Sequence, residues 1–95
     1  MQTQISTRGM ELTGDLESRV EAVSAGLSGR TTGPQLAKFV LEERENIKAV
    51  GLVLSWGEKK DTVVRHAEAG DWDRAFKDLE RKLERALEEG AADSP

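Results

Sequence analysis

Five basic side chains lie close together near the end of the chain: Arg74, Lys77, Arg81, Lys82 and Arg85. In a helix, at 100° per residue, four of them project opposite the apolar side chains and Lys82 lies nearer the border. Lys77, Arg81 and Arg85 follow one another at i, i+4 and i+8, where like charges destabilise a helix by roughly a few tenths of a kcal/mol each. Such a column is better suited to binding an external anion than to stabilising its own helix.

The same basic positions can also form an ordinary solvated face. Three glutamates occupy the adjacent column and allow ion pairs at i+3: Lys77 with Glu80, Arg81 with Glu84, and Arg85 with Glu88. Composition alone favours this second interpretation, because charged runs on helices are usually solvated faces.

His66 is the only histidine, and Glu68, Asp71 and Asp73 follow it closely. Zinc sites assemble three or four ligands, and nucleophilic catalysis needs a nucleophile oriented by a base; the spacing supports neither. The chain also has no cysteine, which removes thiolate chemistry. We therefore expect no catalytic residue, metal, cofactor or small-molecule substrate, and a protein that is not an enzyme.

Two further groups of residues have plain structural interpretations. Residues 29–33, Gly-Arg-Thr-Thr-Gly, lack the Gly-Lys-Ser/Thr end of a phosphate-binding loop and predict a flexible connector. The four aromatic side chains could stack on nucleic-acid bases, but they share the periodicity of their aliphatic neighbours. We expect them to pack in the core: Phe39, Trp56, Trp72 and Phe76.

Elements that would position these residues can be predicted from periodicity. Residues 2–10 are polar and β-branched and predict a strand. A helix follows, with Thr13 as its N-cap and Asp15 in its first turn, and it is expected to end between Gly26 and Gly29. Its apolar stripe consists of Leu16, Val20, Val23 and Leu27.

The middle of the chain predicts strands. In residues 35–43, Ala37, Phe39 and Leu41 alternate as in a strand, yet Leu36, Val40 and Leu41 would also suit a helix. Periodicity leaves both possibilities open. Residues 47–56 predict a strand that is apolar on both faces. A polar turn at residues 57–61 then leads to another predicted strand at residues 62–69.

The last helix is predicted to begin after Asp71, its N-cap, and to reach about Glu89. Its apolar stripe consists of Trp72, Ala75, Phe76, Leu79, Leu83, Ala86 and Leu87. Gly90 ends it, so residues 1–90 are expected to form a single domain and residues 91–95 a disordered tail. If residues 35–43 are a strand followed by a turn at residues 44–46, the order is β-α-β-β-β-α.

Length and composition set the remaining limits. At 95 residues the chain is shorter than the usual roughly 100 to 200 residues per domain. It has no signal-peptide pattern, no membrane-spanning apolar run and no cysteine, so we expect a soluble cytoplasmic protein without a membrane partner. The formal net charge of −4 argues against a nucleic-acid partner only as a total, because five of the 14 basic residues gather on one helix.

Taken in order, these segments resemble the short form of the ribosome hibernation promoting factor and ribosome-associated inhibitor family. Residues 4–13, Gln-Ile-Ser-Thr-Arg-Gly-Met-Glu-Leu-Thr, are similar to the family's opening strand and threonine-capped helix. Residues 67–79, Ala-Glu-Ala-Gly-Asp-Trp-Asp-Arg-Ala-Phe-Lys-Asp-Leu, are similar to its passage from strand to helix. Residues 82–85, Lys-Leu-Glu-Arg, match its signature, and the resemblance spans nearly the whole chain.

The resemblance implies an α+β fold of order β-α-β-β-β-α, with a four-stranded sheet and two helices packed on one face. It therefore selects the strand for residues 35–43. Family members bind the small ribosomal subunit where mRNA and tRNAs lie, and they block translation in stressed or resting cells. The matched signature implies rRNA-binding roles for Lys82 and Arg85, to which the helix geometry adds Arg74, Lys77 and Arg81.

Two hypotheses follow. The first is a ribosome-binding translation inhibitor, or hibernation factor, that occupies the mRNA and tRNA path through basic residues of the last helix. The alternative is a diverged protein-interaction module of the same fold, which forms a homodimer through a sheet face or edge and does not bind RNA. The apolar character of both faces of residues 47–56 motivates the alternative.

Overall fold

The computed structural model describes residues 2–30, 34–56 and 62–88, with residues 28–30 described at the backbone only. Six elements follow one another: β1 (Gln2–Arg8), α1 (Gly14–Arg30), β2 (Leu36–Arg44), β3 (Ile47–Ser55), β4 (Thr62–Ala69) and α2 (Trp72–Glu88). The predicted order β-α-β-β-β-α is confirmed. The predicted turn at 57–61 and the predicted tail at 91–95 lie outside the described residues.

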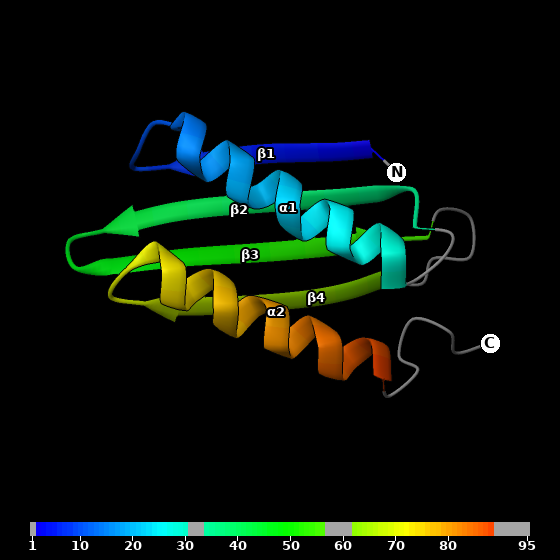
Figure 1. The fold of residues 1–95 in the computed structure, drawn as a ribbon. Helices are drawn as coiled ribbons and strands as arrows, with labels where there is room; N and C mark the ends of the chain where they lie inside the picture. Colours follow the sequence, from blue (N-terminus) through cyan, green and yellow to red (C-terminus); the bar gives the residue numbers. More distant parts are fainter. Residues whose placement is uncertain (1, 31–33, 57–61, 89–95) are drawn as a thin grey trace.

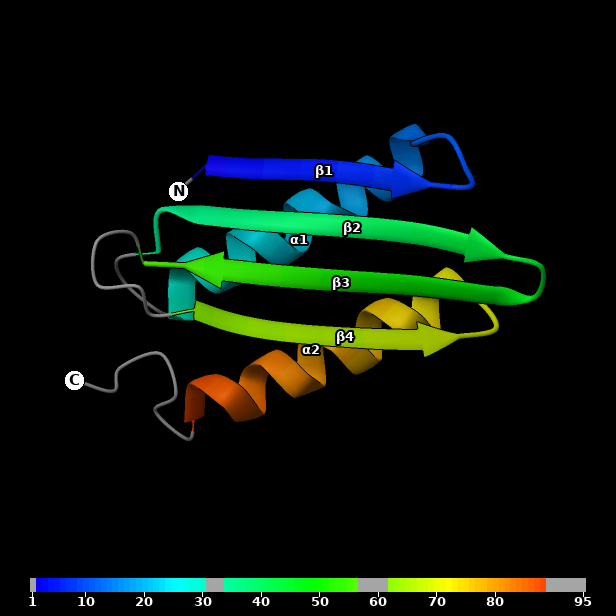
Figure 2. The same ribbon diagram turned by 180° about the vertical axis from the view of Figure 1, so that it is seen from behind.

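The four strands form one sheet in the order β1-β2-β3-β4. β1 runs parallel to β2, as required when a helix connects two neighbouring strands, whereas β2, β3 and β4 are antiparallel. Both helices cover the same face of the sheet, and the other face, here called the open face, carries no helix (Figures 1 and 2). The protein therefore has the expected α+β architecture.

The residues of β2 show why the segment at 35–43 is a strand and not a helix. Ala37, Phe39 and Leu41 are all fully buried and point to the helices. Directly opposite them, the antiparallel register places Leu54, Leu52 and Val50 of β3, which are buried to the same degree. A helix would bury only part of this set, whereas the two-residue period of a strand buries all of it.

Each helix begins as predicted. The backbone amide of Leu16 donates to Thr13 Oγ1 over 3.3 Å, and that of Arg74 donates to Asp71 Oδ1 over 2.8 Å, so both predicted N-caps are confirmed. The predicted stripe of α1 and the apolar residues of α2 then meet the sheet in one core. Within the described residues, no helix is long and apolar enough to span a membrane.

Two predicted boundaries are wrong. α1 continues through Arg30 and does not end between Gly26 and Gly29, so Gly29 and Arg30 belong to the helix backbone. A glycine within a helix, such as Gly29, destabilises it by about 1 kcal/mol relative to alanine. Leu27 is only 4% exposed, and its burial stabilises the C-terminal end of α1 against this cost. β1 ends at Arg8 and not at Met10, because Gly9 turns the chain away with a φ of 68°.

A candidate anion-binding surface on helix α2

Helix α2 separates its apolar and basic residues cleanly. Its buried side chains are Ala75, Phe76, Leu79, Leu83 and Ala86. We call the five cations on its other sides the basic ridge: Arg74, Lys77, Arg81, Lys82 and Arg85, all of them exposed. The structure thus brings the five predicted side chains to the surface of one helix.

Aspartates of the same helix neutralise much of the basic ridge. Arg74 lies 3.5 Å from Asp71, and Lys77 lies 3.1 Å from Asp73. Asp78 contacts two cations, with distances of 3.9 Å to Arg81 and 3.3 Å to Lys82. Arg85 is the exception, because no ion pair links it to another described residue.

The expected pairing with Glu80, Glu84 and Glu88 is therefore wrong: none of these i+3 pairs occurs among the described residues. In every pair found on α2, the acid precedes the base by three or four residues. Helical side chains lean toward the N-terminus, and an acid that precedes its base also suits the helix dipole better. Whether the acid precedes or follows the base along the helix, and not only the spacing between them, therefore decides which ion pairs form.

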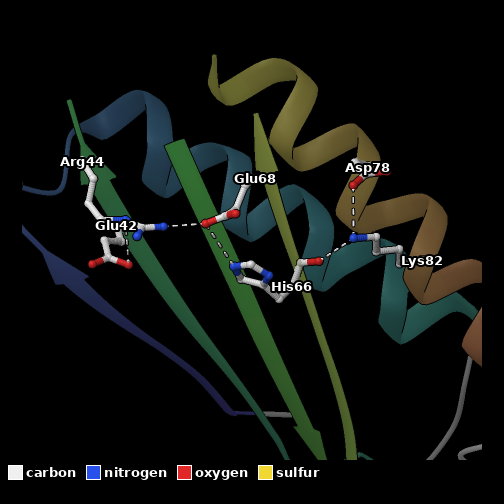
Figure 3. Close-up of polar contacts among 6 residues, drawn as sticks. All are labelled: Glu42, Arg44, His66, Glu68, Asp78 and Lys82. Atoms are coloured by element: carbon white, nitrogen blue, oxygen red, sulfur yellow. Dashed lines mark hydrogen bonds and ion pairs between the residues drawn. The ribbon is translucent and has the colours of Figure 1, made fainter. Parts of the chain in front are cut away.

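Lys82 differs from the rest of the basic ridge (Figure 3). Its Nζ atom donates over 2.8 Å to the backbone carbonyl oxygen of His66 in β4, in addition to the contact with Asp78. Its side chain is 45% exposed, compared with 80% for Arg74 and 69% for Arg81. Lys82 therefore links α2 to β4, and less of it is available to a ligand.

Arg19 of α1 is a further cation of this surface that spacing on α2 does not reveal. Its Nη1 atom donates to Asp73 Oδ1 over 3.0 Å, and its guanidinium lies 5.4 Å from the centre of the Phe76 ring. Lys77 and Arg19 together hold the pKa of the Asp73 carboxyl below its ordinary value of 3.8. Because Arg19 and Asp73 are 54 positions apart, only the packing of the two helices brings them together.

His66 belongs to a row of polar side chains on the open face (Figure 3). Its Nε2 atom lies 3.8 Å from Glu68 Oε2, and Glu68 accepts a 2.5 Å hydrogen bond from Arg44. Arg44 in turn lies 3.7 Å from Glu42. These side chains are at the surface, and the described residues contain no group of acids and histidines that could hold a metal ion.

Among the aromatic residues, Phe39 and Phe76 are fully buried, which confirms the predicted core role and removes them as stacking platforms. Trp56 and Trp72 are partly buried and pack against the core. The rings of Trp72 and Phe76 lie 6.2 Å apart at a tilt of 47°. The aromatic side chains thus pack in or against the core, and those of Trp72 and Phe76 do so from α2 itself.

The fold of the chain is similar to that of proteins of known structure. No protein-family model and no curated protein sequence matches the chain. Among solved structures, a ribosomal subunit interface protein from Coxiella burnetii gives a TM-score of 0.77 at 17% sequence identity, over 94% of this chain and 96% of that chain. The N-terminal domain of Protein Y from Thermus thermophilus gives 0.76 at 21% identity, over 88% and 91%.

The chain shares the fold of these two proteins. The resemblance seen in the sequence is confirmed at the level of the fold, including the strand assignment of β2. At 17% and 21% identity the likeness establishes the architecture.

Proposed function

We propose that this protein is a ribosome-binding translation inhibitor that occupies the mRNA and tRNA path of the small subunit in stressed or resting cells. The observation that carries the proposal is the exposure of the basic ridge on a fold shared with a ribosomal subunit interface protein. Arg81 and Arg85 are its centre, because they are exposed, lie one turn apart, and together have only one acid partner among the described residues.

The chemistry proposed for this surface is electrostatic positioning. Guanidinium groups bind phosphate oxygens through paired N–H donors, and phosphate contacts fix register without reading sequence. One turn of a helix spans about 5.4 Å. Two such groups one turn apart on a rigid helix can therefore bind neighbouring phosphates. Binding of this kind blocks a path by occupancy and requires neither a cofactor nor a covalent step.

The test uses two double variants with the same change in charge. Arg81→Glu with Arg85→Glu reverses two cations of the basic ridge, and Arg8→Glu with Lys38→Glu reverses two cations of the open face. Arg8 and Lys38 are exposed; Lys38 lies between the core residues Ala37 and Phe39, and Arg8 lies three positions after Ile5, which packs against the core. We expect co-sedimentation with small ribosomal subunits to fall at least about tenfold for the first variant and to persist for the second.

Association of the unaltered protein should also weaken steeply as salt is raised, because phosphate binding releases counterions. Retained co-sedimentation of the Arg81→Glu/Arg85→Glu variant across the salt series would overturn the proposal.

One observation favours the second candidate, a dimerising module without RNA binding. Two apolar side chains of the open face remain exposed: Val64 at 57% and Ile47 at 42%. A second copy could cover them. A dimer that does not sediment with ribosomal subunits would select this candidate.

A further inference from the structure

The helix that carries the basic ridge also contains acidic residues close to these cations. Counting the N-cap, α2 contains five bases in the basic ridge and six acids: Asp71, Asp73, Asp78, Glu80, Glu84 and Glu88. Four of the five bases lie within 4.0 Å of an aspartate. At these four cations an RNA phosphate therefore competes with a carboxylate of the same helix, whereas Arg85 has no such competitor among the described residues.

Two of the three aspartates have structural roles. Asp71 caps the N-terminus of α2, and Asp73 links α2 to Arg19 of α1. Asp78 differs, because its ion pairs among the described residues are with Arg81 and Lys82 alone. Removing the charge of Asp78 would thus leave the cap and the contact between the helices in place.

Lys82 would remain anchored in the absence of that charge, since its Nζ atom also donates to the His66 carbonyl. Arg81 would lose the one acid it contacts among the described residues. Its guanidinium, together with Arg85 one turn later, would then have no ion pair with any carboxylate of the described residues.

We propose that Asp78 is an internal competitor that sets the affinity of the basic ridge for RNA phosphates. This inference rests on the proposed function and concerns the regulation of the same surface. Asp78 forms ion pairs with Arg81 at 3.9 Å and with Lys82 at 3.3 Å, and a phosphate oxygen that binds either cation competes with this carboxylate. Surface ion pairs of this kind are weak, so the exchange is accessible at equilibrium.

The test compares Asp78→Asn with Glu80→Gln. Both remove one negative charge from the same helix, but Glu80 makes no ion pair with the basic ridge among the described residues and lines the groove between α1 and α2. Binding is measured with purified small ribosomal subunits and with a short single-stranded RNA, across a salt series, and circular dichroism verifies that the helices are kept.

We expect Asp78→Asn to tighten binding about two- to fivefold more than Glu80→Gln does. The slope of log K against log salt should steepen by about 0.7 to 0.9 for each additional phosphate that the ridge binds, which a purely structural role would not change. Equal affinities and slopes for the two variants would overturn the inference while leaving the proposed function standing. Failure of the unaltered protein to bind either probe would overturn the proposed function itself, and this inference with it.

Discussion

Among single residues, Lys82 joins the helical layer to the sheet. It reaches from α2 to the carbonyl oxygen of His66, which belongs to the edge strand β4. Edge strands offer unpaired backbone groups to other chains, and a lysine on the edge is a common protection against such pairing. Lys82 therefore stabilises the packing of α2 and occupies an acceptor that a foreign strand could use.

Replacing Lys82 by methionine keeps most of the aliphatic stem and removes the charge. We expect Lys82→Met to lower the free energy of unfolding by about 0.5 to 1.5 kcal/mol, because the hydrogen bond to His66 and the pair with Asp78 are lost together. Lys77→Met is the matched control, since the one ion pair of Lys77 with a described residue is with the exposed Asp73. Urea titrations of both variants provide the measurement, and equal losses would show that the link to β4 has no stabilising role.

Asp73 gives a prediction for the dependence of stability on pH. Lys77 and Arg19 lower the pKa of its carboxyl in the folded state below 3.8. The ionised form thus contributes stability at pH values above 3.8, and the contribution is lost as the pH falls through the lowered pKa. The melting temperature of Asp73→Asn should lie below that of the unaltered protein at pH 7, and the two should converge near pH 2. A difference in melting temperature that stays constant down to pH 2 would show that the ionised Asp73 carboxylate does not contribute this stability.

At the scale of elements, the connection from β1 to α1 depends on one glycine. Gly9 has a φ of 68°, and a Cβ atom at this position would lie 2.9 Å from the backbone oxygen of Glu43 at the end of β2. A side chain is therefore excluded both by the backbone conformation and by the neighbouring strand. Gly26 within α1 has open space instead, with nothing within 4 Å of an added Cβ.

The two glycines predict opposite effects of the same substitution. Gly9→Ala should destabilise the protein by about 1 to 3 kcal/mol, because it adds the cost of a left-handed conformation to a backbone contact. Gly26→Ala should stabilise it by about 0.5 to 1 kcal/mol, because alanine has the higher helix propensity. Chemical denaturation of both variants measures the two changes in the free energy of unfolding. A Gly9→Ala protein as stable as the unaltered one would show that the connection from β1 to α1 can rearrange.

Apart from β2, the periodicity of the sequence is sufficient to predict the elements, because burial on one face repeats every two residues in β3 and β4 and every three to four residues in α2. It could not decide β2, whose partners Leu52 and Val50 lie on another strand. It also missed the Arg19–Asp73 pair and the end of α1. These features depend on contacts between segments far apart in the chain, whereas periodicity reports only one segment at a time.

At the scale of the whole molecule, the two layers expose different chemistry. The helical layer carries the basic ridge, with Asp73 and Asp78 interleaved. The open face mixes valines with charges: the register of the strands places Lys38 opposite Val53, which is opposite Val64. At the far end of these strands, Ala49 lies between Glu42 and Glu68. Neither of these rows is apolar throughout, so a second copy would have to bury charges to cover the valines.

We therefore expect the protein to remain monomeric, and we expect the proposed ribosome binding to be independent of the open face. Val64→Glu places a charge on the most exposed of its valines and should change neither the sedimentation coefficient nor co-sedimentation with small subunits. Analytical ultracentrifugation over a range of concentrations, with Val64→Thr as the isosteric control, measures this. A dimer that dissociates in Val64→Glu but not in Val64→Thr would contradict the prediction. If that dimer also failed to sediment with ribosomal subunits, it would select the second candidate, a dimerising module without RNA binding.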